Sequence, residues 1–141
     1  MEFKGLVQKL CKQPGMWVSK PYFPSVCAYI RGYDDAREGG PLAGFREWLI
    51  VQLDDGNNLS WEGLVRKIIF RSEISDVPVQ AQEEMESLLK LASLIDEYLV
   101  FRSLNGITKI YYDYAQWLLK KHWYSGTLRA KQKSTLIHPS S

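Results

Sequence analysis

Residues 80–103 carry the clearest helical pattern in the sequence. Apolar residues recur there every three or four positions, which gathers them on one side of an α-helix. A helix that is apolar over much of its circumference is normally covered by several neighbours. We therefore expect 80–103 to be the central helix of the fold. Its inward stripe is predicted to consist of Met85, Leu88, Leu89, Ala92, Ile95 and Leu99, widened by Leu91, Leu94, Tyr98 and Phe101.

Shorter helical patterns flank this segment. Pro14-Gly15 should end the first of them, and Asn105-Gly106 should end the central helix. Ser60 is a suitable N-cap for "WEGLVRKIIF", which is predicted to be helical although "KIIF" also has strand character. The pattern indicates an all-α, single-domain bundle of about five or six helices packed on 80–103. The other expected helices are 2–13, one that starts near Phe23 or Pro24, 42–53 (with Phe45, Trp48, Leu49 and Leu53 inward) and 107–123 (with Ile110, Tyr114, Trp117 and Leu118 inward).

The chain of 141 residues is long enough for one hydrophobic core. We expect residues 1–125 to form the helical domain. Residues 126–141 are polar and basic, so they are predicted to be a C-terminal extension, in which "STLIH" could add a short strand.

Charge is distributed unevenly along the chain. Residues 21–125 contain 11 Lys and Arg against 15 Asp and Glu, whereas the first 20 residues and the tail are basic. A nucleic-acid-binding protein normally has a basic face on its folded body, so this distribution argues against one. The most apolar stretch, 88–101, is interrupted by three charged residues, and no membrane span is expected. The two cysteines, Cys11 and Cys27, lie in apolar helical patterns and are predicted to be buried free thiols, as in a cytoplasmic protein.

Residues for catalysis are sparse. The only histidines are His122 and His138, and the sequence has no HExxH, CxxC, P-loop or GxSxG pattern. Acid pairs such as Asp54-Asp55 are adjacent, so on a helix their side chains would point about 100° apart. We therefore predict no enzyme activity, no cofactor and no metal site, and we interpret "DDGNN" at 54–58 as a polar turn.

Glycines and one apolar corner give further local predictions. Gly32 and Gly44 lie in helical patterns, where glycine costs roughly 1 kcal/mol relative to alanine, so close helix–helix contact is expected at both. "PGMW" at 14–17 follows the first helix and should turn the chain into the second. Met16 and Trp17 are predicted to be buried against helix 42–53.

The order of motifs over residues 5–65 resembles that of a group of small bacterial proteins. The motifs are "PGMW", a helix that ends in "YIRGYDDA", then "GFREWLIVQL", and after a polar turn "LSWEGLV"; Ser19 replaces a glycine of the group's pattern. Members of such groups are encoded beside polymorphic or contact-dependent growth inhibition toxins and act as immunity proteins. The resemblance implies a cytoplasmic protein that binds the C-terminal domain of a cognate toxin, such as a ribonuclease or other nuclease, and covers its active site.

An acidic surface would suit a basic nuclease cleft, because charge complementarity speeds association. The alternatives are a nucleic-acid-binding or regulatory helical protein, which the basic ends would support, and a small enzyme that uses a lone Asp or Tyr. The residues predicted to contact the toxin are Asp34, Asp35, Glu38, Glu73, Asp76, Glu83, Glu84 and Glu86.

Overall fold

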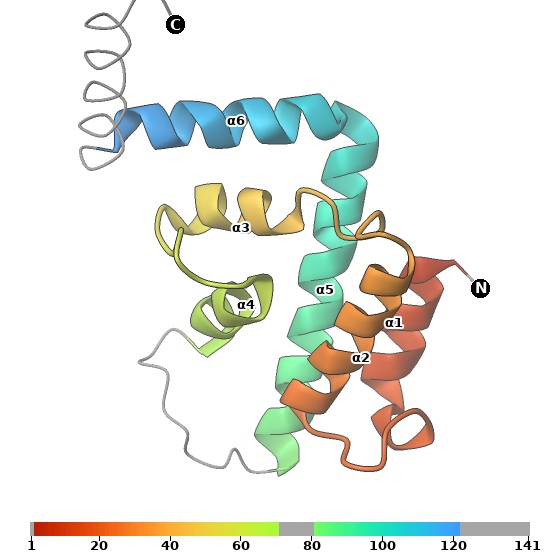
Figure 1. Cartoon of the computed structure of the whole chain (residues 1–141). Helices are drawn as coiled ribbons and strands as arrows, with labels where there is room; N and C mark the ends of the chain where they lie inside the picture. Colours follow the sequence, from red (N-terminus) through yellow and green to blue (C-terminus); the bar gives the residue numbers. More distant parts are fainter. Residues whose placement is uncertain (1, 71–80, 122–141) are drawn as a thin grey trace, which may run out of the picture.

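The computed structural model describes residues 2–70 and 81–121, with side chains from residue 84 onward in the second segment. Its described part is all-helical, as predicted (Figure 1). His122, His138 and the predicted extension at 126–141 lie outside the described residues. The helices are α1 (Phe3–Lys12), η1 (Pro14–Met16, a 3₁₀ turn), α2 (Phe23–Ala36), α3 (Phe45–Leu53), α4 (Trp61–Phe70), α5 (Ala81–Asn105) and α6 (Ile107–Lys120).

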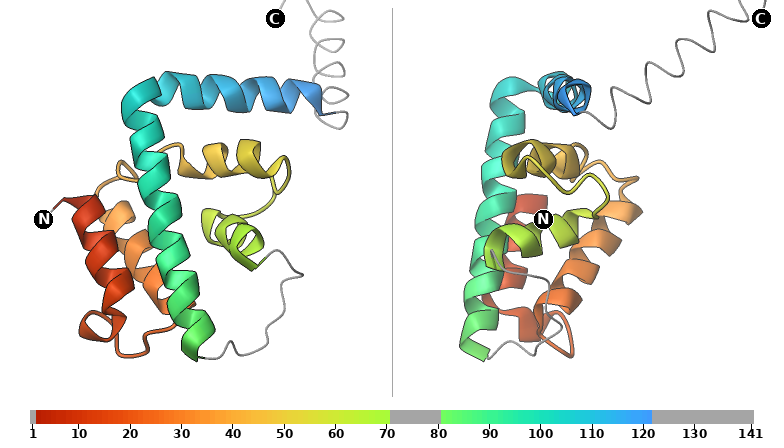
Figure 2. Two further views of the ribbon diagram at one scale, coloured as in Figure 1. Left: turned by 180° about the vertical axis from the view of Figure 1, so that it is seen from behind. Right: turned by 90° about the vertical axis from the view of Figure 1, so that its left-hand side faces the viewer.

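Helix α5 is the centre of the bundle, which confirms the prediction for 80–103. It packs against all five other α-helices. In Figure 2, α1 and α2 lie on one side of α5, while α3 and α4 lie on the other. Helix α6 turns away at Asn105-Gly106 and runs across the end of the bundle above α3 (Figure 1).

The local signals for helix ends act largely as expected. Pro14 follows the end of α1, and Ser60 precedes α4, where its Oγ accepts a hydrogen bond from the N–H of Gly63 at 3.3 Å. Helix α3 begins three residues later than predicted, because 41–44 form a turn. Gly44 ends that turn with φ +84°.

An aromatic cluster joins α3 to α5. Phe45 and Trp48 of α3 pack against Tyr98, with ring centroids 5.2 and 5.5 Å away. Tyr98 is fully buried, and its hydroxyl donates a hydrogen bond to the carbonyl of Ala43. The predicted inward residues of α6 also belong to the core: Ile110 and Trp117 are buried, and Tyr114 and Leu118 pack against them.

Two predictions about α5 and α2 were wrong. Met85 and Leu89 are 48% and 45% exposed, while Leu88, Leu91, Ile95 and Tyr98 form the buried stripe. Because α5 is apolar on most sides, its own pattern does not decide which side the neighbours cover. A Cβ added at Gly32 would meet no atom of another helix within 4 Å, so no close contact explains this glycine. At Gly44 the expected close contact is present, since a Cβ there would lie 2.6 Å from the Tyr98 hydroxyl, although Gly44 precedes α3 and does not lie inside a helix.

The "PGMW" corner also differs from expectation. Met16 is 77% exposed instead of buried. Trp17 is half-buried and packs edge-on against Tyr29 of α2, with centroids 6.1 Å apart, and not against α3. The 3₁₀ turn at Pro14–Met16 explains both results, because it leaves Met16 at the outer edge and folds Trp17 back onto α2.

Candidate functional site

The predicted toxin-binding acids do not form one cluster. Asp34 is half-buried at the end of α2, and its Oδ1 accepts a hydrogen bond from the N–H of Leu42 at 2.8 Å. Glu84 of α5 accepts one from the N–H of Phe23 at the opposite end of α2. Since eleven residues of helix separate Phe23 from Asp34, these two acids are about 16 Å apart along the axis. Both therefore hold the fold together.

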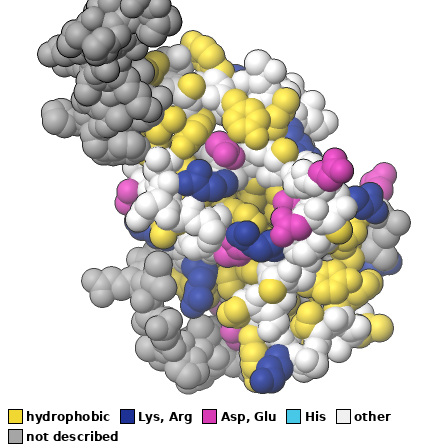
Figure 3. Space-filling model, in the orientation of Figure 1, with side chains coloured by type: hydrophobic (Ala, Val, Ile, Leu, Met, Phe, Trp, Pro, Cys, Tyr) yellow, Lys and Arg dark blue, Asp and Glu magenta, His cyan; other side chains and the backbone are white. Residues whose placement is uncertain are grey.

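The other predicted acids are scattered. Asp35 and Glu38 are exposed at the end of α2, and Glu86 is exposed near the start of α5. Glu73, Asp76 and the side chain of Glu83 lie outside what the structure describes. Figure 3 shows acidic and basic side chains interspersed over the visible face, with no segregated acidic or basic area.

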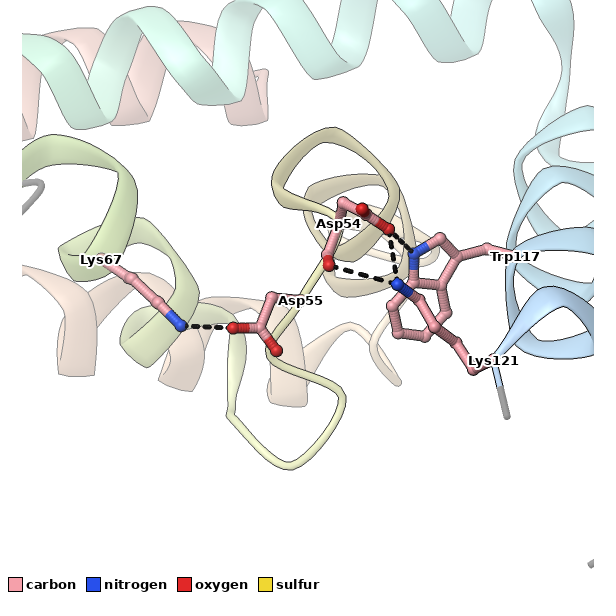
Figure 4. A network of polar contacts seen from close by, with 5 residues as sticks. All are labelled: Asp54, Asp55, Lys67, Trp117 and Lys121. Carbon is pink, nitrogen blue, oxygen red and sulfur yellow. Dashed lines mark hydrogen bonds and ion pairs between the residues drawn. The ribbon is translucent and has the colours of Figure 1, made fainter. Parts of the chain in front are cut away.

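A polar depression lies between the α3–α4 turn and the end of α6. It has a volume of about 390 Å³ and is open to solvent. Its centre is the turn that follows α3, with side chains from α4 and α6 on either side (Figure 4). It is lined by Asp54, Asp55, Asn57, Asn58, Trp117 and Lys121.

The backbone of this turn is tightly determined. Asp54 ends α3 in the left-handed conformation, with φ 59°, and its N–H donates to the carbonyl of Ile50 at 2.7 Å. Gly56 has φ +90°, and a Cβ there would lie 2.4 Å from Leu64 Cδ2. Only glycine fits this position without displacing the core. The sequence "DDGNN" was correctly interpreted as a turn.

Side chains from two helices hold the turn in place. Arg46 of α3 donates through Nε to the carbonyl of Leu59 at 2.8 Å and through its second terminal nitrogen to the carbonyl of Asn57. The Tyr114 hydroxyl of α6 donates to Oδ1 of Asn57. The turn is therefore held in one conformation by hydrogen bonds from α3 and α6, without any ligand.

Asp54 receives two hydrogen bonds from the end of α6 (Figure 4). The indole Nε1 of Trp117 and the Nζ of Lys121 each donate to Asp54 Oδ1 at 2.7 Å. The Lys121 ammonium also lies 4.8 Å from the centroid of the Trp117 ring. The hydrogen bond from Lys121, followed by that from Trp117, lowers the pKa of Asp54, so this carboxylate is ionised at neutral pH.

Asp55 has a similar partner on α4. Lys67 Nζ donates to Asp55 Oδ2 at 2.7 Å, and this bond is the main cause of the lowered pKa of Asp55. The Asp54 and Asp55 side chains nevertheless remain 72% and 69% exposed. We call Asp54, Asp55, Asn57 and Asn58 the acidic turn. It presents two adjacent carboxylates and the exposed Asn58 to solvent, which suits guanidinium or ammonium groups.

The two cysteine thiols are confirmed as buried and free. Burial raises the pKa of Cys11 to about 12 and raises that of Cys27 as well. Both therefore stay protonated at neutral pH, and a thiol is a weak nucleophile compared with a thiolate.

Neither a metal cluster nor a membrane helix is found in the described ranges. Across 2–70 and 81–121, no three His, Cys, Asp or Glu side chains are arranged to hold a metal ion. None of the helices in these ranges combines the length and apolar character needed to cross a bilayer.

Comparison with protein-family models, curated proteins and solved structures found no match to this chain. Sequence reasoning identified Asp54-Asp55 as a pair but did not select it as a contact site. No local sequence pattern indicates the partners of Asp54, because Asp54 meets Trp117 and Lys121 only after α6 packs on α3.

Proposed function

We propose that this chain is an immunity protein that binds a cognate toxin domain, a nuclease, and neutralises it by covering its active site. The acidic turn is the contact that enters the toxin's substrate cleft. The observation that carries this proposal is the pair of exposed, ionised carboxylates on one clamped turn.

Charge supports this choice of partner. A nuclease cleft binds the phosphate backbone, so it is lined by lysine and arginine side chains. Asp54 and Asp55 offer such a cleft two neighbouring exposed carboxylates, and cations of the toxin would share them with Lys121 and Lys67 or displace these lysines. Hydrogen bonds between charged groups are about twice as strong as neutral ones, so carboxylates can replace phosphates as partners for these side chains.

Pre-organisation supports it as well. Binding costs free energy when a flexible loop must be ordered. Here Arg46 and Tyr114 already hold the turn through Asn57 and Leu59. The resemblance of residues 5–65 to immunity proteins points to the same class of partner.

The test is co-expression with the C-terminal domain of the protein encoded by the upstream neighbouring reading frame. We expect this chain to relieve growth inhibition by that domain and to co-purify with it. Persistent growth inhibition together with no complex would refute the immunity function.

A pair of double variants tests the site. Asp54→Asn with Asp55→Asn should weaken the complex at least about tenfold, since hydrogen bonds to ionised groups are roughly twice as strong as those between neutral groups. The comparison variant, Asp35→Asn with Glu38→Gln, removes the same charge from two exposed residues at the end of α2, which the sequence also predicts as contacts. An equal loss in both variants would mean that only net charge matters and that the acidic turn is not the contact.

A further assay addresses the alternative role. Salt-sensitive binding of random duplex DNA by the isolated chain would favour a nucleic-acid-binding function. We expect no such binding at physiological salt, because residues 21–125 carry 11 Lys and Arg against 15 Asp and Glu.

A further inference from the structure

The outward side of α5 carries exposed apolar side chains. Met85, Leu89 and Val100 are 48%, 45% and 48% exposed, and Leu104 is 80% exposed. At 3.6 residues per turn, these four residues lie within about 100° of arc on the helix. In the right view of Figure 2, α5 lies at the left edge of the bundle, with most of the other described helices to its right. The solvent-facing side of a surface helix is normally polar, so this stripe needs an explanation.

The separations between successive residues of the stripe are the same whether they are read from the N-terminal or the C-terminal end of α5. They are four, four, three, four and four residues. The members, which we call the α5 stripe, are Met85, Leu89, Ser93, Asp96, Val100 and Leu104.

Such a sequence is self-complementary when two copies pack antiparallel. A twofold axis midway between Ser93 and Asp96 places Met85 opposite Leu104 of the partner subunit. It also places Leu89 opposite Val100 of the partner subunit, so apolar residues meet apolar residues at both ends. Contacts in which residue i meets j, and j meets i, are the defining feature of an isologous dimer interface.

The polar centre of the stripe is compatible with this packing. Ser93 would lie opposite the partner's Asp96, where a hydroxyl can donate to a carboxylate. Asp96 is already 2.9 Å from Lys4 Nζ of α1. Lys4 therefore offsets the repulsion between the two aspartates near the axis.

One pair of charges beside the stripe is complementary, whereas Glu86, at the same angle as Leu104, would lie opposite an uncharged position of the partner subunit. Lys90 and Glu97 lie on the same flank of α5, and neither takes part in an ion pair within the described ranges. A twofold axis places this flank of α5 beside the same flank of α5 in the partner subunit. Lys90 would thus lie about 3 Å along the axis from the partner's Glu97, at a 1.5 Å rise per residue, and the pair occurs twice.

We propose that the α5 stripe is a homodimer interface, in which α5 of two copies of this chain packs antiparallel. The stripe is about 28 Å long on a helix about 10 Å wide, so the two helices alone bury roughly 300 Å² per partner. A standard interface buries about 800 Å² per partner, so this is a small interface and the dimer is a weak one that exchanges with the monomer. This interface does not involve the acidic turn and does not depend on the immunity function.

Cysteine cross-linking tests the register. Met85→Cys and Leu104→Cys are made in separate full-length proteins, mixed, and oxidised. We expect a disulfide-linked dimer in the mixture but not in either protein alone, because two copies of position 85 would be about 28 Å apart. The native Cys11 and Cys27 are buried and should not interfere. Leu104→Cys mixed with Tyr112→Cys, an exposed position on α6, measures random cross-linking.

Sedimentation of the full chain tests the dimer itself. We expect a monomer–dimer equilibrium between about 1 and 100 µM. Leu89→Glu with Val100→Glu should give a monomer with an unchanged helical circular dichroism spectrum. Lys90→Glu should weaken the dimer roughly three- to tenfold, and adding Glu97→Lys should restore it.

Two results would overturn the proposal. One is a chain that stays monomeric at about 1 mM, a concentration above the whole expected range of dissociation constants. The other is a dimer in which Met85→Cys alone cross-links as readily as the mixture, because that result excludes the antiparallel register.

Discussion

Glu84, near the start of α5, accepts a hydrogen bond from the backbone N–H of Phe23, the first residue of α2, with Oε2 3.0 Å from the nitrogen. The two residues are 61 positions apart in the chain. The carboxylate supplies an acceptor at the N-terminus of α2, where the N-cap residue Tyr22 provides no side-chain hydrogen bond. A negative charge is favourable there because of the helix dipole.

Replacing Glu84 by alanine should therefore lower the free energy of unfolding by about 1–2 kcal/mol, as the loss of a helix cap does. Urea denaturation measures the change. Glu86→Ala is the matched control, because Glu86 is exposed on the same turn of α5, and it should change stability by less than about 0.5 kcal/mol. Equal effects of the two variants would show that the Phe23 contact contributes nothing.

Gly44 and Gly32 should respond to alanine in opposite directions. At Gly44, the positive φ and the 2.6 Å approach to the Tyr98 hydroxyl make a Cβ costly, and we expect a loss of about 2–4 kcal/mol. At Gly32, inside α2 and with open space around it, alanine should stabilise the protein by roughly 0.5–1 kcal/mol. Thermal unfolding of both variants measures these changes in stability. A Gly44→Ala variant as stable as the unmodified protein would contradict the packing between α3 and α5.

The buried thiols should make the protein less stable at alkaline pH. The pKa of Cys11 is about 12 in the folded protein and about 8.5 in an unfolded chain. The stabilisation by the protonated thiol is therefore complete below about pH 8.5 and is lost as pH rises toward 12. Each thiol should reduce the free energy of unfolding by up to about 1.4 kcal/mol per pH unit in this range.

Urea denaturation between pH 8 and 11 measures that slope. The Cys11→Ala, Cys27→Ala double variant is the control, and it should show a shallower dependence on pH even though it is less stable at neutral pH. Identical slopes would mean that other groups cause the alkaline loss.

The carboxyl group of Asp54 should titrate below its ordinary range, since Lys121 and Trp117 both donate to it. The stabilisation from this ion pair is present at neutral pH and is lost as pH falls through the lowered pKa. The NMR signal of the Trp117 indole N–H should shift with the same midpoint. Lys121→Ala should raise that midpoint, whereas Lys120→Ala, which removes an exposed neighbouring charge, should leave it unchanged.

Much of the fold could be predicted from the sequence because helix signals are local. Pro14, Ser60 and Asn105-Gly106 mark helix ends through backbone chemistry that acts within a few residues. The periodicity of 80–103 correctly indicated a central helix. It did not indicate which side of that helix would be covered, because Met85 and Leu88 are equally apolar and only their neighbours in space differ.

The candidate site was harder to predict for the same reason. The composition of 54–58 determines that a turn forms there, but the partners of Asp54 come from α6, 63 and 67 residues later. The acids at 34 and 84, predicted as toxin contacts, also have roles within the fold. A short acidic side chain beside a helix end satisfies backbone N–H groups as readily as it attracts a partner, and both of these do so.

The central position of α5 has a consequence for how the chain is made. Helices α1 to α4 leave the ribosome first, yet the surface on which they pack is synthesised only when residues 81–105 follow. Until then their apolar sides have only one another to cover them. Contacts between α1 and α5 join segments about 80 residues apart, and such distant contacts slow folding. The newly made N-terminal half should therefore be the part of this protein most dependent on chaperones.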